Sequence, residues 1–372
     1  MNRHTIPLGR ILKIPIGLDY SWFLIFVLLT WIFAVGYYPR MLQGSPSSIF
    51  WLLGASTAIM LFVSVLIHEL GHSLVARRYN VPVKSITLFI FGGVSQITKE
   101  PTSASSEFWI AVAGPATSFL LAILFGLLQT VFTTVAPLFA LAKYLAFING
   151  TLAVFNLIPG FPLDGGRVFR AIVWGVTKNF NRSTVIAANV GRFIAFLFIM
   201  FGILLMFRGN FANGLWIAVI GWFLESAATA QIHQQTVHVR LAGHKVSDAM
   251  SQSCTFIPAD RTIQQLVEEQ VFGAGQRCFI VRTGKRVLGL LTLHNIKNVP
   301  REQWATVTGD QIMIPLNDVK SVPPNEELEA ALQEMDRDGV NQLPVMTNGS
   351  VLGMLTREDV IDYLRTLSDL GV

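Results

Sequence analysis

The chain has 372 residues, of which 52% are hydrophobic and only 14% charged, whereas about a quarter of the residues in ordinary soluble domains are charged. Residues 1–240 carry 16 basic and 6 acidic side chains, and residues 241–372 carry 12 and 17. This division predicts a membrane-embedded part with basic loops followed by an acidic soluble part, so the excess of positive charge does not indicate a nucleic-acid partner.

Six apolar stretches are long enough to cross a bilayer, which takes about 20 residues of helix. The first is too long for the apolar region of a signal peptide and lacks a convincing cleavage site. The sequence therefore predicts a polytopic α-helical membrane protein of about six transmembrane helices, with both termini on one side. The expected spans are residues 16–36, 50–75, 108–134, 138–158, 191–207 and 213–231, of which the fourth is short and broken by proline.

Basic residues indicate the side of the membrane on which the termini lie, because cytosolic loops of membrane proteins are enriched in lysine and arginine. We expect a multi-pass protein of the cell (inner) membrane with cytosolic N and C termini. The two cysteines, Cys254 and Cys278, suggest no disulfide framework and suit a reducing compartment. Eleven basic residues fall on the side of the termini (Arg3, Arg10, Lys13, Arg77, Arg78, Lys84, Lys99, Arg167, Arg170, Lys178 and Arg182) and three on the other (Arg40, Lys143 and Arg208).

The second stretch contains LIHELGH, residues 66–72, which places two imidazoles and a carboxylate in an otherwise uncharged span. His68 and His72 are four residues apart, so a helix presents them on one face, where they can chelate one ion. Glu69 is turned about 100° away and can act as a general base on a metal-bound water. The alternative is a chance match, but an apolar span offers no solvated face, and a charge there costs about 2.5 kcal/mol or more.

Residues 85–97, SITLFIFGGVSQI, are rich in β-branched and aromatic residues, and Gly92 and Gly93 supply a turn or bulge. They predict a short membrane-associated β-hairpin. A strand edge beside a metal site can bind an extended peptide, which makes Gly92 and Gly93 candidate substrate-binding residues. The alternative is an interfacial re-entrant loop without substrate contact. Further on, Ala113 to Ser118 (AGPATS) bring small residues into the third span, which is typical of close helix packing.

A catalytic zinc takes three protein ligands and a water, so a third ligand must come from outside the HELGH segment. The candidates are Asp164, Glu225, Asp19 and His233. Asp164 is favoured because Pro159 and Pro162 end the fourth span just before it, at the depth expected for the histidines. Its alternative role is the N-cap of a helix from Gly165 onward. The other three candidates are expected at helix contacts or at the membrane interface.

HELGH followed by N-x-x-P-x-x-P-L-D-G-G, which begins at Asn156, resembles the paired motifs of the site-2 protease family of intramembrane zinc metalloproteases. The similarity covers about residues 50–225 and includes the number of spans and the short strands. Some members carry a PDZ domain, for which this chain has no room. The resemblance implies one zinc ion per chain on His68, His72 and Asp164, with Glu69 as the catalytic base.

The resemblance also implies that Asn156 lies near the site, where its amide would hold the substrate backbone or stabilise the oxyanion. By its chemistry alone, Asn156 can equally hydrogen-bond a neighbouring helix. Zinc is favoured over other divalent ions because two imidazoles and a carboxylate suit it.

The soluble part contains an internal repeat, each copy of which is predicted to fold as β-α-β-β-α. A proline-led turn opens each copy, an amphipathic helix follows, and a second helix begins after a threonine. The aligned segments are IPADRTIQQL (257–266) with VPPNEELEAAL (322–332), CFIV (278–281) with LPVM (343–346), and GLLTLHNI (289–296) with GMLTREDV (353–360).

This repeat resembles a pair of cystathionine-β-synthase-type (CBS) domains, which form one α+β module. The resemblance implies binding of an adenosine nucleotide, with Thr356 and Asp359 near the ribose and Thr292 and Asn295 in the matching positions. The alternative is that these residues only cap helices, since Thr356 and Asp359 form a capping-box variant. Dimerisation through these domains is also plausible.

The whole sequence therefore predicts a membrane-embedded zinc metalloprotease domain over residues 1–240 and two CBS repeats over 241–306 and 307–372. The expected activity is hydrolysis of peptide bonds within or near the transmembrane helices of a substrate protein, regulated by nucleotide binding to the CBS pair. The alternatives are a metal-ion transporter or channel with a regulatory CBS pair, and a catalytically inactive binding protein of the same fold.

Overall fold

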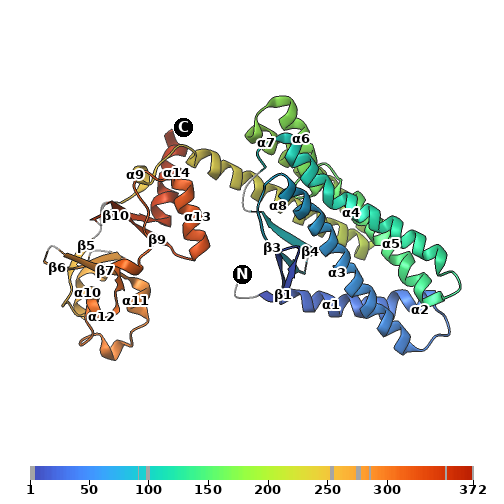
Figure 1. The fold of residues 1–372 in the computed structure, drawn as a ribbon, viewed down its shortest axis with the longest axis horizontal. Coiled ribbons are helices and arrows are strands. Elements are labelled where there is room, and N and C mark those ends of the chain that lie inside the picture. Colours follow the sequence, from blue (N-terminus) through green and yellow to red (C-terminus); the bar gives the residue numbers. More distant parts are fainter. Residues whose placement is uncertain are drawn as a thin grey trace. The chain divides into compact units, whose positions relative to one another are not determined.

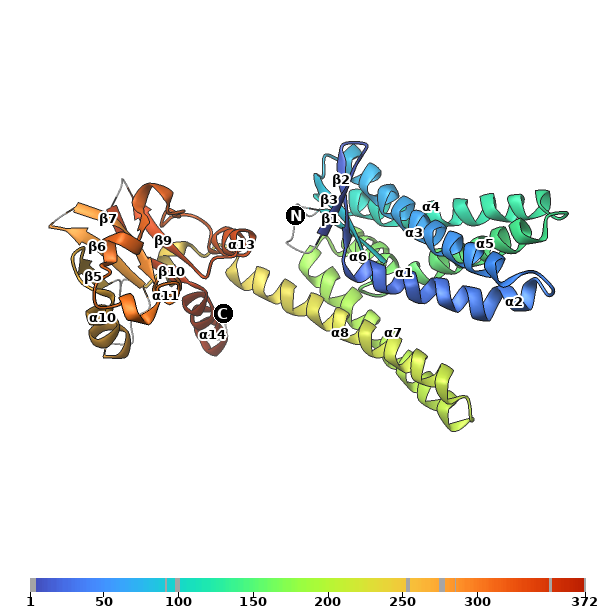
Figure 2. The same cartoon turned by 90° about the horizontal axis from the view of Figure 1, so that it is seen from below.

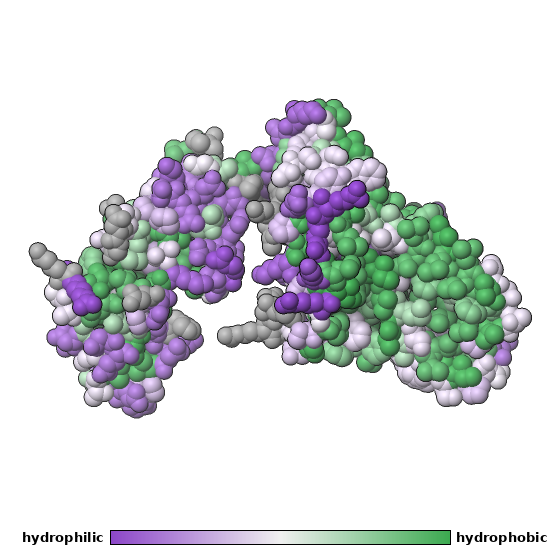
Figure 3. Space-filling model, viewed as in Figure 1, coloured by the Kyte–Doolittle hydropathy of each residue, from purple (hydrophilic) through white to green (hydrophobic). Residues whose placement is uncertain are grey.

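The protein is described from a computed structural model, which covers residues 5–90, 92–97, 101–251, 255–273, 278–284, 286–347 and 350–370. The chain forms two compact units, Met1–Gln235 and Thr236–Val372 (Figure 1). The surface of the first unit is mainly hydrophobic over its long helices, and that of the second is more hydrophilic (Figure 3). Arg3, Lys99 and Cys254 lie outside the described residues.

The first unit consists of long helices and one small sheet. Its elements are β1 (Thr5–Ile11), β2 (Ile14–Asp19), α1 (Ser21–Ile32), the π-helical η1 (Phe33–Tyr37), α2 (Tyr38–Met41), α3 (Ser47–Arg78), β3 (Val83–Phe89), β4 (Gly92–Ile97), α4 (Ala104–Val131), α5 (Ala136–Asn156), α6 (Asp164–Thr177), α7 (Phe180–Phe207) and α8 (Phe211–Leu241), which continues into the second unit.

The polytopic architecture predicted from the sequence is confirmed. Six described stretches are long and apolar enough to cross a membrane: Ser21–Met41, Ser47–Arg78, Ala104–Val131, Ala136–Asn156, Phe180–Phe207 and Phe211–Leu241. The fifth begins well before the expected residue 191, because the polar residues of its first turns are satisfied within the helix. Ser183 and Thr184 are buried, and their hydroxyls donate to the carbonyls of Asn179 and Phe180.

The four strands form a sheet in the order β1-β2-β3-β4, beside the second half of α3 (Figure 2). The predicted hairpin over residues 85–97 is present as the antiparallel pair β3–β4, with β4 at the sheet edge. The other two strands were not predicted. Ile16 and Leu18 are buried residues of β2, so their apolar character marks a strand and not the start of the first span, which begins at Ser21.

Helices α3 and α4 approach closely where the sequence has small residues. A side chain at Gly71 would place its Cβ 2.8 Å from Thr117 Cγ2 and 3.0 Å from the carbonyl oxygen of Ala113. Only glycine lets the backbones meet at this distance. The AGPATS segment therefore provides the close packing that its composition predicted.

The second unit is an α+β module, as predicted for the CBS pair. Its elements are α9 (Val246–Ala249), β5 (Thr255–Pro258), α10 (Ile263–Leu266), η2 (Val267–Phe272), β6 (Cys278–Thr283), β7 (Arg286–Thr292), α11 (Leu293–Lys297), η3 (Arg301–Gln303), α12 (Gly309–Ile312), β8 (Ile314–Pro315), η4 (Leu316–Asp318), α13 (Leu328–Asp338), β9 (Gln342–Thr347), β10 (Ser350–Thr356) and α14 (Arg357–Leu370).

The two repeats of this unit interlock. The amide of Val246, near the start of the first repeat, donates to the carbonyl of Glu326 in the second at 2.9 Å. In the same way the amide of Gly309, near the start of the second repeat, donates to the carbonyl of Arg261 in the first at 2.9 Å. The predicted division at residues 306 and 307 stays a prediction.

Candidate metal centre

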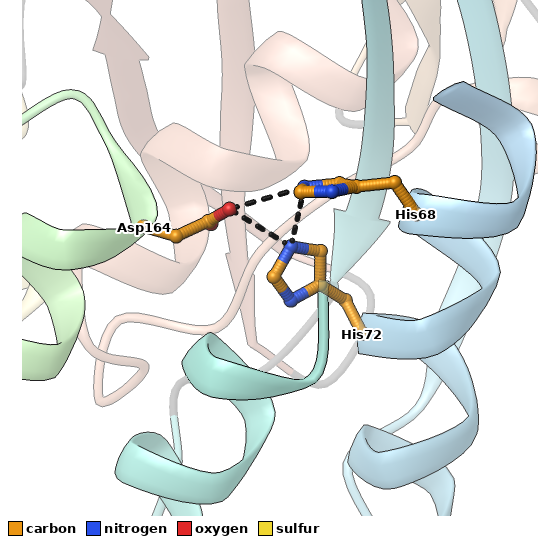
Figure 4. A group of neighbouring side chains, drawn as sticks. All are labelled: His68, His72 and Asp164. Carbon is orange, nitrogen blue, oxygen red and sulfur yellow. Dashed lines mark hydrogen bonds and ion pairs between the residues drawn. The ribbon is translucent and has the colours of Figure 1, made fainter. Parts of the chain in front are cut away.

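The HELGH segment lies in the middle of α3's second half and places two imidazoles on one buried face. His68 and His72 are each 4% exposed, and their Nε2 atoms are 3.2 Å apart. Asp164, the first residue of α6, points its carboxylate at both rings (Figure 4). Its Oδ2 lies 3.1 Å from each Nε2 atom. Three side chains far apart in the sequence therefore converge on one point.

These spacings fit a zinc ion. Zinc is bound by imidazole nitrogen and carboxylate oxygen at about 2.0–2.2 Å, and in a tetrahedron its ligand atoms are then about 3.3–3.6 Å apart. The three candidate ligand atoms all lie within 4.8 Å of one another and are paired at 3.1–3.2 Å. Among the described residues they form the one group of this kind. Three protein ligands leave the fourth position for water, as in catalytic zinc sites.

Helix α4 fixes the orientation of both rings. His72 Nδ1 donates to the carbonyl of Ile110 at 2.7 Å, so its proton is on Nδ1 and its Nε2 is left with a free lone pair. His68 Nδ1 lies 2.8 Å from Ser118 Oγ. Outer partners of this kind hold the ligands of metal sites in place. Neither Ile110 nor Ser118 was identified as a site residue from the sequence.

Gly114 of α4 lies against both histidine rings and was not identified from the sequence as a site residue. A Cβ at this position would lie 2.6 Å from His68 Nε2 and would clash still more closely with His72 Nε2 and Cε1. A methyl group would thus occupy the space between the ligand atoms. The AGPATS segment carried this signal, but its composition alone does not say which small residue faces the histidines.

The carboxylate ligand is held by the way α6 begins. Cβ atoms at Gly165 and Gly166 would clash with the backbone of residues 157–161, so the turn before α6 is packed directly on the helix start.

A buried ion pair ties α6 to α4. Arg170 is 5% exposed, and its Nε donates to Glu107 Oε1 at 2.7 Å, with a second contact from Nη2. The guanidinium also lies over the rings of Phe161 and Phe180, at 5.1 and 4.5 Å from their centroids. Arg170 was counted from the sequence among the basic residues of a cytosolic segment, whereas in the fold it is buried and paired.

Glu69 contacts the edge strand of the sheet. Ser95 of β4 donates its hydroxyl to Glu69 Oε2 at 2.6 Å, and a Cβ at Gly93 would lie 2.6 Å from Glu69 Cγ. The backbone of the edge strand therefore passes directly over the carboxylate. Gly92 has φ +132°, a conformation that side chains rarely adopt. Ser95 was not predicted, because nothing in the sequence aligns it with α3.

The other candidate ligands have different partners or positions. Asp19 lies just before α1 and accepts from the amide and the hydroxyl of Ser21 at 2.9 and 2.6 Å. Glu225 lies 3.4 Å from Arg192, and His233 is exposed on α8. Asn156 is the half-buried last residue of α5, and no contact recorded for the described residues joins it to the metal ligands, so its role stays a prediction.

The four residues predicted to bind nucleotide are helix caps. Thr292 and Asn295 form a capping box at α11, with Thr292 Oγ1 donating to Asn295 Oδ1 at 2.6 Å. At α14, Thr356 Oγ1 donates to Asp359 Oδ2 at 2.7 Å, and the amide of Asp359 donates back to Thr356 Oγ1. Each pair is satisfied without a ligand.

Comparisons with known proteins agree with this geometry. Peptidase family M50 matches residues 56–137 and 133–200, and the CBS domain family matches 310–366, the second repeat. A protein of Synechocystis sp. named as a zinc metalloprotease is 35% identical over 98% of this chain and 96% of its own. A protein of Mycobacterium tuberculosis named "Putative zinc metalloprotease Rip3" is 36% identical over 96% of this chain and 92% of its own.

Among solved structures, the site-2 protease of Methanocaldococcus jannaschii is 35% identical, covering 61% of this chain and 95% of that chain, with a TM-score of 0.44. The fold, the metal centre and the relatives define a membrane-embedded zinc metalloprotease. The chain belongs to peptidase family M50, the site-2 protease family, with a CBS module after its last membrane helix.

Proposed function

We propose that the protein is an intramembrane endopeptidase that hydrolyses peptide bonds within or near the transmembrane helices of a substrate protein. The observation that carries the proposal is the meeting of His68, His72 and Asp164 with their ligand atoms 3.1–3.2 Å apart, with Glu69 one residue from the first of them. If these three residues only stabilised the fold, they would not need the Glu69 carboxylate beside them at the edge of β4.

His68, His72 and Asp164 would hold the ion, which when bound supplies a Lewis acid that lowers the pKa of a water molecule toward about 7. Glu69 acts as general base and then as general acid: its carboxylate takes the proton of the attacking water and passes it to the leaving amine. The hydroxyl of Ser95 fixes the orientation of that carboxylate, and Gly114 keeps the space between the ligands open.

The free edge of β4 presents the substrate. Peptide bonds in a helix are shielded, so a substrate helix has to unwind, and an extended segment can then pair with an edge strand. Gly93 brings this edge against Glu69, and a Cβ at Gly92 would meet nothing within 4 Å. Asn156 is assigned to holding the substrate backbone or the oxyanion, a role that its place at the end of α5, ahead of the Asp164 turn, supports.

The remaining assignments concern the surroundings of the site. Both termini are placed in the cytosol of a cell (inner) membrane, with the protease domain over residues 1–240. The CBS repeats, 241–306 and 307–372, regulate cleavage by binding an adenosine nucleotide and are also a dimerisation surface. The family likeness and the tethering of the CBS module to α8 support these assignments.

The test is Glu69→Gln in the purified full chain, with zinc content and cleavage of a reporter transmembrane helix measured together. We expect stoichiometric zinc in wild type and variant, and cleavage in wild type only, reduced at least about 100-fold by the substitution. Zinc loss in Glu69→Gln would show that this residue is a ligand and not a base. A wild-type protein that holds zinc, cleaves no reporter and transports zinc into vesicles would overturn the proposal in favour of a transporter.

A further inference from the structure

An open pocket lined by basic residues lies at the C-terminal end of α3. Its volume is about 510 Å³, within the range of about 300–1,000 Å³ that is usual for ligand sites. Leu74, Arg77 and Arg78 line it from the last turns of α3, and Leu12 and Lys13 line it from the turn between β1 and β2. Three cations and two leucines from distant segments thus surround one space, and none of the described lining residues is acidic.

The turn between β1 and β2 is formed by residues that rarely form such a turn. Ile11 pairs with Ile14, so Leu12 and Lys13 are its two central residues, and their φ angles are 51° and 66°. Asparagine and glycine adopt positive φ readily, whereas leucine and lysine are strained there. Strain of this kind clusters at ligand clamps and other functional sites. Here the two strained residues are the two that this turn contributes to the pocket.

The fold uses one of the three cations and leaves the other two available. Arg77 Nη1 donates to the carbonyl of Leu12 and so ties the turn to α3. Lys13 and Arg78 are exposed, and within the part of the chain that the structure describes, neither side chain has a recorded ion pair or hydrogen bond. Two uncompensated cations in one pocket favour an anionic ligand.

The pocket is at the level of a membrane where such anions are concentrated. Arg78 ends the candidate span Ser47–Arg78, so the pocket lies where the hydrocarbon core meets the headgroups. Large apolar side chains are exposed beside the cations: Leu8 is 57%, Leu12 54% and Leu74 46% exposed. Apolar side chains at this depth contact acyl chains while neighbouring cations reach the lipid phosphates.

Two simpler explanations of the basic residues account for part of the pocket only. Arg77 and Arg78 offset the partial negative charge at the C-terminal end of α3, but Lys13 belongs to another element and is not needed for this. The enrichment of cytosolic loops in basic residues explains the side on which all three lie. It does not explain why they converge on one space with two exposed leucines.

We propose that this pocket binds the headgroup of one anionic phospholipid. The lipid phosphate contacts Lys13 and Arg78, and the apolar part of the lipid lies along Leu12 and Leu74. The proposed topology places this lipid in the cytosolic leaflet. The site is separate from the metal centre, and it depends on neither zinc nor proteolysis.

The test is native mass spectrometry of the full chain in a neutral detergent, with phosphatidylglycerol or phosphatidylcholine added. Wild type is expected to bind one phosphatidylglycerol per chain at least about tenfold more tightly than phosphatidylcholine. Lys13→Gln combined with Arg78→Gln should weaken phosphatidylglycerol binding at least about tenfold, because both proposed phosphate contacts are lost. Equal binding of the two lipids by wild type would overturn the proposal.

Lys84→Gln combined with Arg182→Gln is the matched control. It removes one lysine and one arginine that are exposed and expected on the same side of the membrane, and neither lines the pocket. Phosphatidylglycerol binding should be unchanged in this control. Equal loss in the two double variants would show a diffuse attraction to the whole basic surface and would overturn the pocket.

Two further measurements separate a lipid from a free anion. Inorganic phosphate at millimolar concentration should leave phosphatidylglycerol bound, and complete displacement would assign the pocket to a soluble anion instead. Leu12→Asn places a residue that tolerates positive φ in the turn, so the unfolding temperature should not fall. The same variant should weaken phosphatidylglycerol binding at least about threefold, and unchanged binding would contradict the apolar contact. Because the readout is lipid binding, failure of the proposed proteolysis would not change these outcomes.

Discussion

The polar residues singled out in the sequence have different partners in the two units. In the first unit, His68 and His72 are buried and contact Asp164 from another helix. In the second unit, Thr356 and Asp359 complete a helix cap and need no ligand. A polar group that the fold does not require is strong evidence for function, whereas one that the fold already uses is weak evidence.

Removing a proposed metal ligand tests the group in the first unit, and it should have the largest effect of all the substitutions. His68→Ala and Asp164→Ala are each expected to weaken zinc binding more than 100-fold, beyond the roughly 10–100-fold loss of an outer partner. Zinc content of the purified protein measures this. Glu225→Ala, a rejected candidate, serves as control and should keep full zinc. Stoichiometric zinc in Asp164→Ala would remove the third ligand from the site.

Gly114→Ala should be nearly as damaging, although it changes no ligand. Its methyl group would sit between the two Nε2 atoms, so zinc content and cleavage are both expected to fall at least about tenfold. Gly126→Ala in the same helix is the matched control, because a Cβ there meets nothing within 4 Å. Equal zinc content in the two variants would contradict the packing of Gly114 against the rings.

The ion pair between α4 and α6 comes next. Arg170→Leu leaves Glu107 buried without the guanidinium and is expected to cost about 3–5 kcal/mol of stability, measured as unfolding of the full chain in detergent. The double variant with Glu107→Leu should be less destabilised than the single one. Asp362→Asn, which removes an exposed pair with Arg365 in the second unit, should cost less than about 1 kcal/mol. Similar losses at both pairs would contradict this order.

The smallest effect is expected at the helix caps of the second unit. Thr356→Ala should lower its stability by about 1 kcal/mol, with zinc content and reporter cleavage unchanged. Calorimetry of the full chain, with and without an adenosine nucleotide, measures this. Nucleotide stabilisation of wild type that disappears in Thr356→Ala would show that the residue contacts a ligand as well as capping α14.

The spacing of the histidines and the expected depth of Asp164 pointed to the three residues that meet in the structure, because both are local properties of the sequence. The spacing of His68 and His72 follows from helix geometry alone, and the proline-rich break before Asp164 marks a carboxylate at the right level of the membrane. The alternative prediction, Asp164 as an N-cap, placed a helix start within one residue of the observed one, since Asp164 is the first residue of α6. It points to the histidines nonetheless.

What could not be predicted depends on which segments face each other. Gly114 and Ser95 become site residues only once α4 and β4 are placed against α3, and no local pattern fixes that register. The strands at residues 5–19 were missed for a related reason. Ile14, Ile16 and Leu18 alternate as in a strand, but next to a long apolar run they look like the start of a membrane helix.

The parallel pairing of β2 with β3 has a consequence for how the protein is made. Residues 16–18 of β2 pair with residues 86–88 of β3, so the sheet cannot form until two membrane spans have left the ribosome. Asp164 emerges later still, after two more. The group formed by His68, His72 and Asp164 is therefore completed only after four spans have been synthesised.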